Sequence, residues 1–128
     1  MYKRQLQRLG SFSGEFATHG EATAVMYRPG KILQLGGNTS GGTNAVVIDI
    51  NGPAPEVRAV EDMGVARSAW PSSQILADGT VLVTGGSRLV NDAVTAALNP
   101  EIWDPDTEKW TVVSGFKWPR LYLSLIHI

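Results

Sequence analysis

The chain has 128 residues, of which 43% are apolar and 18% charged, as in folded globular domains rather than disordered segments. Its 11 basic and 12 acidic residues are spread along the sequence, so neither a nucleic-acid partner nor an anionic membrane surface is expected. Apolar runs are far shorter than the roughly 20 residues of a bilayer-spanning helix, and the absence of cysteine excludes disulfides, thiolate metal sites and a cysteine nucleophile within these residues.

The first predicted element is a β-hairpin over residues 22–37, which read ATAVMYRPGKILQLGG. Two apolar runs flank Arg28-Pro29-Gly30, where proline presets φ at the second turn position and glycine accepts a positive φ at the third. The apolar runs that follow predict a third strand over Ala45–Ile50 and an outer fourth strand over Val57–Val60.

A second hairpin is predicted over residues 72–86, because Asp78-Gly79 is a strong turn signal between two apolar runs. The segment PEIWDPDTEKWTVV predicts a third hairpin, in which Asp104-Pro105-Asp106 turns the chain between Glu101–Trp103 and Lys109–Val113. No apolar stripe with the period of a helix is long enough to predict one. The fold class is therefore predicted to be all-β.

The first two hairpins repeat one plan. Ala24–Gly37 and Ser73–Gly86 have the same length, both end in Gly-Gly, and lie 49 residues apart, which is the period of a β-propeller blade of four antiparallel strands. A glycine pair at a strand end permits a close backbone approach that a side chain would block. We expect Tyr27, Trp103 and Trp110 to lie between the sheets or at their edges.

The pairing of Gly85-Gly86 with Trp103 and Trp110 resembles the kelch repeat. The order AVMY..GKILQLGG, ARSAWPSSQILADGTVLVTGGS, PEIWDPDTEKW and PRLY is similar to that in the catalytic propeller of galactose oxidase and related copper-radical oxidases. The resemblance implies a partial kelch-type β-propeller over residues 21–122, about two and a half blades of a seven-bladed ring. Residues 1–20 would then be a lead-in, either a blade remnant or a loop.

In that family the last of these motifs is typically R-x-Y-H-S, whose Tyr and His are both copper ligands. Arg120 and Tyr122 match its Arg and Tyr, but Leu123 stands where the His belongs. The resemblance implies that Tyr122 is the axial copper ligand and the base that accepts the substrate's hydroxyl proton in the intact protein. It also implies a Tyr-Cys radical cofactor and a second His ligand outside this segment, so this chain alone is expected to be inactive.

The resemblance also points to residues that would line a substrate pocket. Ser87 and Arg88 follow the second Gly-Gly pair, and Trp70 precedes an inner strand. The alternatives are a solvated loop for Ser87 and Arg88 and packing between blades for Trp70. Galactose oxidase has Gln at the position of Ser87, so the implied substrate is a small alcohol, aldehyde or carbohydrate rather than galactose in particular.

The last six residues, Leu123–Ile128, match the translation of a transposon end that is ligated to DNA fragments during library preparation. We expect them to be an adapter-derived tail, with His and then Ser or Thr following Tyr122 in the parent gene. The alternative is a genuine strand, because the six residues roughly alternate in polarity.

Two function classes remain open at this stage. The first is a piece of a copper-radical oxidase that converts an alcohol or aldehyde with O₂ into an oxidised product and H₂O₂, with secretion of the intact protein implied by the resemblance. The second is a non-catalytic kelch propeller that binds a protein or a glycan through its loops, since the fold alone does not choose between them.

Overall fold

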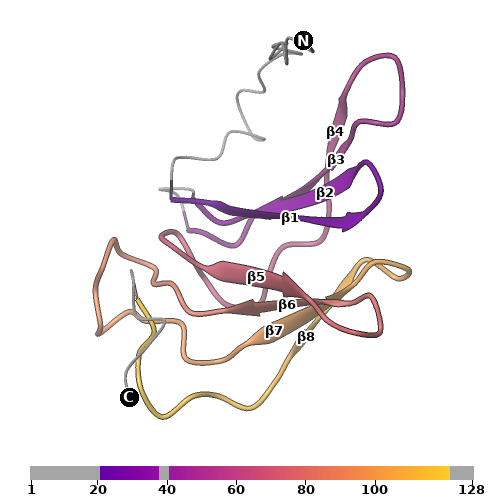
Figure 1. The fold of residues 1–128 in the computed structure, drawn as a ribbon. Helices are drawn as coiled ribbons and strands as arrows, with labels where there is room; N and C mark the ends of the chain where they lie inside the picture. Colours follow the sequence, from indigo (N-terminus) through magenta and orange to yellow (C-terminus); the bar gives the residue numbers. More distant parts are fainter. Residues whose placement is uncertain (1–20, 38–40, 122–128) are drawn as a thin grey trace, which may run out of the picture.

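The computed structural model describes residues 21–37 and 41–121, and all secondary structure in these ranges is β (Figure 1). The predicted all-β class is therefore confirmed. The strands of the first sheet are β1 (Thr23–Arg28), β2 (Lys31–Leu35), β3 (Ala45–Asp49) and β4 (Glu56–Ala59). The strands of the second sheet are β5 (Ser72–Ile75), β6 (Val81–Thr84), β7 (Glu101–Asp104) and β8 (Lys109–Val112).

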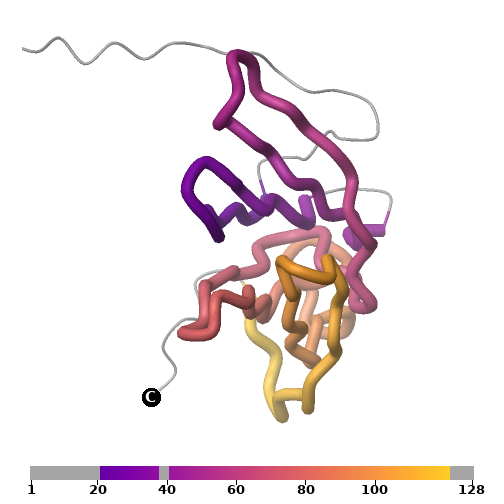
Figure 2. Tube along the Cα trace, turned by 90° about the vertical axis from the view of Figure 1, so that its right-hand side faces the viewer, coloured from indigo at the N-terminus to yellow at the C-terminus, as the bar shows by residue number. Residues whose placement is uncertain are grey.

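Each sheet is a simple antiparallel meander, in which every strand pairs with the next one along the chain. We call β1–β4 the first blade and β5–β8 the second blade. Figure 2 shows the first blade, in indigo and magenta, above the second. The arrangement matches two successive blades of a partial propeller. Of the two and a half blades predicted over residues 21–122, the described residues 21–37 and 41–121 form two complete four-stranded sheets.

The predicted turns lie at the expected positions. Gly30 and Gly79 have φ values of +69° and +87°, in the left-handed region that favours glycine. Asp78 supports its own turn, because its Oδ1 accepts hydrogen bonds from the Thr80 amide at 3.0 Å and the Thr80 hydroxyl at 2.6 Å. The third and fourth strands of the first blade deviate from the expected bounds by only one residue.

The core lies in the seam between the two blades. Tyr27 of β1 meets Trp103 of β7 edge to face, with ring centroids 4.9 Å apart, and Trp110 of β8 lies 6.4 Å from Trp103. Trp103 is completely buried. The expectation that these three aromatic residues lie between or at the edges of the sheets is confirmed, and such aromatic contacts add about 0.5–1.5 kcal/mol beyond burial.

The two blades bury opposite faces of equivalent strands. In β2 the buried side chains are Leu33 and Leu35, whereas in β6 they are Val81 and Val83. When the two Gly-Gly pairs are aligned, Leu82 is the residue of the second blade that corresponds to Leu33, and it is only partly buried. Because successive strand residues point to opposite faces, each blade turns one face toward the other blade and one face away.

The seam has two ends with different connections. The tight turns between β1 and β2 and between β5 and β6 lie at one end, which we call the turn end, on the right of Figure 1. The longer segments lie at the opposite end, which we call the loop end; their described residues are 36–37, 41–44, 60–71, 85–100 and 113–121. Trp70, Ser87 and Arg88, which the sequence analysis singled out, belong to these longer segments.

Candidate functional site at the loop end of the blades

The second Gly-Gly pair holds the segment that leads to Tyr122. The Gly86 amide donates a hydrogen bond of 2.9 Å to the Arg120 carbonyl oxygen. A Cβ atom on Gly85 would lie 2.9 Å from that same oxygen, closer than real Cβ contacts, and Gly85 has a φ of +65°. The glycine pair therefore allows the close backbone approach that was predicted. Tyr122 itself lies outside the described residues.

Ser87 is buried completely, so the solvated-loop alternative is wrong for this residue. Its amide and carbonyl groups both pair with Ala69 at 3.2 Å, and a second bridge joins it to Ala96. Its hydroxyl donates a hydrogen bond of 2.6 Å to the Leu89 carbonyl. Ser87 thus lies between the segments that contain Ala69 and Ala96, which cover it. Its role in lining a substrate pocket stays a prediction.

Arg88 is exposed and begins a loop at the loop end that is closed by hydrogen bonds. Its amide donates to the Thr95 carbonyl at 3.0 Å, and the Asp92 carboxylate accepts hydrogen bonds from the Val94 amide at 3.0 Å and the Thr95 hydroxyl at 2.9 Å. These bonds close residues 88–95 into a loop whose tip is apolar, with Val94 93% exposed. A substrate contact by Arg88 also remains a prediction.

Trp70 is partly buried and has an unusual backbone conformation. Its φ is 50°, in the left-handed region, and it precedes Pro71, a position that normally favours extended backbone. A hydrogen bond of 2.9 Å from its amide to the Glu21 carbonyl and the adjacent Ala69–Ser87 bridge hold this conformation. Such strain costs about 1–3 kcal/mol, but Asn91 and Glu108 have similar φ values of 53° and 56°. A role of Trp70 in lining a substrate pocket therefore stays a prediction.

A buried ion pair lies beneath these residues, and the sequence analysis missed it. Arg67 Nη2 and Glu101 Oε2 are 3.3 Å apart, and neither side chain has any exposed surface. Arg67 Nη1 donates to the Gly85 carbonyl at 2.6 Å, Nη2 also donates to the Asn99 carbonyl, and Glu101 Oε1 accepts a hydrogen bond of 2.7 Å from the Gly64 amide. Burial lowers the pKa of Arg67, and the Glu101 carboxylate opposes this effect. A charge at the start of an apolar strand, as in PEIW, was the one signal in the sequence.

The described residues do not form a metal site. They contain no group of three or more His, Cys, Asp or Glu side chains that could hold a metal ion. Tyr122, and both histidines, His19 and His127, lie outside these residues. A copper oxidase centre needs imidazole and phenolate donors together, so the donor set of residues 21–37 and 41–121 does not fit copper.

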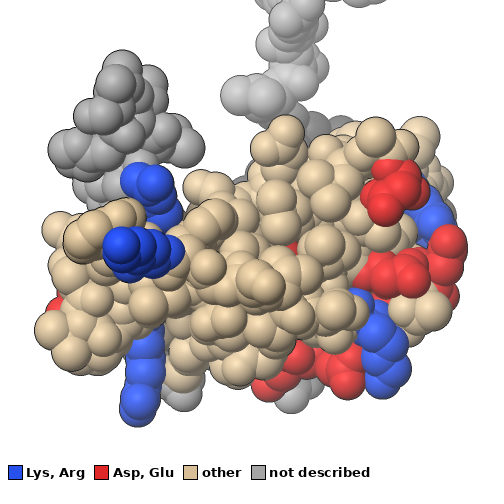
Figure 3. Space-filling model, turned by 90° about the horizontal axis from the view of Figure 1, so that it is seen from below, with Lys and Arg blue, Asp and Glu red and all other residues tan. Residues whose placement is uncertain are grey.

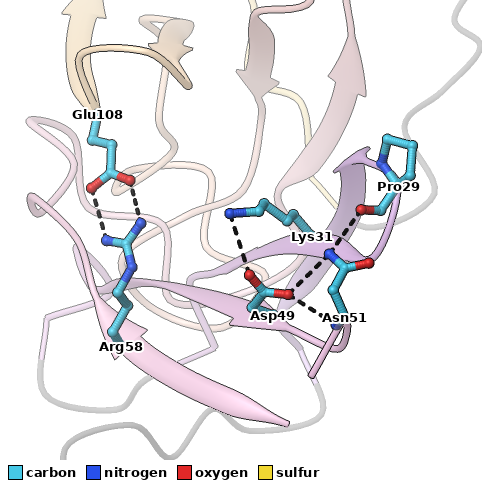
Figure 4. Close-up of polar contacts among 6 residues, drawn as sticks. All are labelled: Pro29, Lys31, Asp49, Asn51, Arg58 and Glu108. Atoms are coloured by element: carbon cyan, nitrogen blue, oxygen red, sulfur yellow. Dashed lines mark hydrogen bonds and ion pairs between the residues drawn. The ribbon is translucent and has the colours of Figure 1, made fainter. Parts of the chain in front are cut away.

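At the turn end, the polar contacts are ion pairs between exposed side chains. Arg28 pairs with Asp106 at 2.6 Å, and Arg58 donates hydrogen bonds to the Glu108 carboxylate from both terminal guanidinium nitrogens, Nη1 and Nη2 (Figure 4). Each of these pairs joins the first blade to the second. Within the first blade, Asp49 accepts hydrogen bonds from the Asn51 amide and side chain and pairs with Lys31 at 3.3 Å.

A pocket of about 400 Å³ opens at this end. Its lining includes Tyr27, Arg28, Asp78, Asp104 and Asp106. The hydroxyl and amide of Thr80 lower the pKa of Asp78, and the amide of Asp106 lowers that of Asp104, so both carboxylates already serve their own turns. The charged residues at the turn end thus join the two blades or stabilise turns. We therefore take the loop end as the better candidate for a functional site.

Among the described residues, no helix is long and apolar enough to cross a membrane.

No protein-family model matches the chain, and no curated protein matches it either. A solved structure of a fungal alcohol oxidase of the AA5 family, in complex with copper, is similar to it, with 27% sequence identity and a TM-score of 0.72. The match covers 80% of this chain but only 23% of the oxidase. The two blades are thus structurally similar to part of a galactose oxidase-like copper enzyme, which supports the relationship inferred from the motif order.

Proposed function

We propose that the chain is part of the catalytic propeller of a copper-dependent oxidase that converts a small alcohol or aldehyde with O₂ into the oxidised product and H₂O₂. The single observation that carries this proposal is the similarity to the copper-bound fungal alcohol oxidase over 80% of the chain. The order of the sequence motifs supports it independently of the strand arrangement. The reaction belongs to the intact protein, because the chain spans 23% of that oxidase.

Within this proposal, Tyr122 serves as the axial copper ligand and general base, and Trp70, Ser87 and Arg88 belong to the rim of the substrate pocket. The support for Tyr122 is the match of Arg120 and Tyr122 to the Arg and Tyr of the R-x-Y-H-S motif. The bound copper would supply the one-electron chemistry, with the Tyr-Cys cofactor and the His ligands contributed by the remainder of the intact protein.

A chimeric enzyme tests the proposal. Residues 22–122 of this chain replace the matching blades of the fungal oxidase, and the fungal sequence resumes at the residue after the matching tyrosine. We expect one copper per protein and H₂O₂ formation from an alcohol that the fungal enzyme oxidises. Tyr122→Phe in the chimera should lower this rate by roughly 10²–10⁴-fold, the usual contribution of a general base.

Tyr27→Phe is the matched control, because the Tyr27 ring packs in the seam against Trp103 and lies away from the loop end. It should leave the oxidase rate of the chimera nearly unchanged. A folded chimera that binds copper but is insensitive to Tyr122→Phe would contradict the assignment of Tyr122. A native gene that reads LSLIHI after Tyr122 would favour the non-catalytic propeller that binds a protein or a glycan.

A further inference from the structure

The side chain of Asn51, which follows β3, holds the turn between β1 and β2 at the turn end. Its Nδ2 donates hydrogen bonds of 3.1 Å to the Pro29 carbonyl and 3.0 Å to Asp49 Oδ1 (Figure 4). Its backbone amide donates to the same Asp49 oxygen at 2.9 Å. The side chain also packs so closely on Gly30 that a Cβ atom there would collide with it. We call these hydrogen bonds the Asn51 network.

The two side-chain bonds of the Asn51 network depend on the amide form of residue 51. The Pro29 carbonyl and the Asp49 carboxylate only accept hydrogen bonds, so each needs an N–H group opposite it. Hydrogen bonds from the Asn51 amide and from Lys31 lower the pKa of Asp49, which is therefore ionised at neutral pH. A carboxylate at position 51 would lose both side-chain bonds and would face the negative charge of Asp49.

The residue that follows Asn51 is suited to convert its amide. Asn51 precedes Gly52, and no other asparagine of the chain precedes a glycine. Because glycine has no side chain, its backbone nitrogen can approach the Asn51 Cγ atom without obstruction. Both residues are exposed, and the Gly52 amide makes no hydrogen bond with the described residues. The bonds of the Asn51 network are exposed too, so they can open without unfolding of the blade.

The charges around the turn end do not favour a new carboxylate. Figure 3 shows Lys, Arg, Asp and Glu side chains gathered on its right, the side on which the turn end lies. The ion pairs at this end include Arg28–Asp106, Lys31–Asp49 and Arg58–Glu108. A carboxylate at position 51 would therefore compete for cations that are already paired with acidic groups.

We propose that Asn51-Gly52 is a site of spontaneous deamidation, and that this modification releases the β1–β2 turn from the end of β3. The Gly52 backbone nitrogen gives up its proton to hydroxide and attacks Asn51 Cγ. A carbon–nitrogen bond forms, the bond from Cγ to Nδ2 breaks, and Nδ2 takes up a proton and leaves as ammonia. Water then opens the cyclic imide at either carbonyl, which gives aspartate or isoaspartate. Water is consumed and ammonia is released, and no atom is oxidised or reduced.

The chemical step can be followed by incubating the 128-residue chain in mildly alkaline buffer and analysing its peptides by mass spectrometry. We expect aspartate and isoaspartate to accumulate at position 51, faster as the pH rises. Asn99 is the internal control, because it precedes Pro100, whose nitrogen has no proton to lose. Gly52→Ala is the matched variant, since its Cβ would meet the Ala54 carbonyl oxygen at an ordinary distance of 3.5 Å. It should slow the conversion several-fold without lowering the Tm.

Asn51→Asp reproduces the aspartate product and tests the structural consequence. Its Tm at pH 7 should be lower by roughly 3–6 °C, as for the net loss of about one hydrogen bond. Adding Asp49→Asn sets an amide opposite the new carboxylate, so the double variant should melt above Asn51→Asp.

Three results would each overturn the proposal: no conversion of Asn51 in the folded chain, an Asn51→Asp variant with an unchanged Tm, or a double variant no more stable than Asn51→Asp. None of these measurements depends on copper, so they are independent of the test of the proposed oxidase.

Discussion

At the loop end of the seam, Arg67 and Glu101 are both fully buried, whereas at the turn end the Arg28 and Asp106 side chains are 47% and 78% exposed. Both ends join the same two blades, yet their charges lie in different surroundings. A buried pair has given up its hydration and depends on its partner, while an exposed pair contributes only about 0–1 kcal/mol. Trp70, Ser87 and Arg88 therefore lie at the loop end of the seam, where the buried ion pair fixes the geometry more strictly than the exposed pair does at the turn end.

Removing one partner of the buried pair should have the largest effect. Glu101→Ala leaves the Arg67 guanidinium buried without a carboxylate, and we expect the free energy of unfolding to fall by about 3–5 kcal/mol. Urea denaturation of the 128-residue chain measures the loss. The double variant Arg67→Met with Glu101→Val, which removes both charges, should lose less than the sum of its single variants. A neutral Glu101→Ala would show that the loop end does not depend on this pair.

The Gly-Gly pair offers a second way to break the loop end. Gly85→Ala combines a φ of +65° with a Cβ placed 2.9 Å from the Arg120 carbonyl, and we expect a loss of about 1–3 kcal/mol. Gly79→Ala is the matched control at the turn end, because Gly79 has a φ of +87° but nothing within 4 Å of the added atom. It should lose less, since only the backbone term remains. Equal losses in the two variants would mean that the close approach at Gly85 is unimportant.

The aromatic contact in the middle of the seam should respond more weakly. Tyr27→Leu keeps an apolar side chain but removes the edge-to-face contact with Trp103, for an expected loss of about 0.5–1.5 kcal/mol in urea denaturation. Burial raises the pKa of Tyr27 above its ordinary value near 10, so its phenol should titrate later than a free tyrosine when absorbance is followed at alkaline pH. A normal titration would show that the seam is open to water at Tyr27.

The same contrast explains what the sequence could reveal. The hairpins were predictable because turns such as Arg28-Pro29-Gly30 and Asp78-Gly79 act within a few residues. The Arg67–Glu101 pair joins residues far apart in the chain, and nothing local in ARSAW marks its arginine as buried. The burial of Ser87 likewise depends on bridges from both Ala69 and Ala96. Motif order pointed to the loop end, but the contacts that shape it are long-range.

The exposed pair Arg58–Glu108 should give the smallest effect on stability, and this effect should depend on pH in the acid range. The hydrogen bonds from Arg58 lower the pKa of Glu108, so this contribution to stability is complete above the ordinary Glu pKa of about 4.3 and is lost as the pH falls through the lower folded value. Because the two side chains are 53% and 34% exposed, Glu108→Gln should cost at most about 1 kcal/mol at pH 7. At pH 2.5 the variant and the unmodified chain should unfold at more nearly the same urea concentration, and added salt at pH 7 should also narrow the gap. A gap that is as wide at pH 2.5 as at pH 7 would mean that Glu108 stabilises the turn end through packing rather than charge, and the contrast between the two ends of the seam would then rest on burial alone.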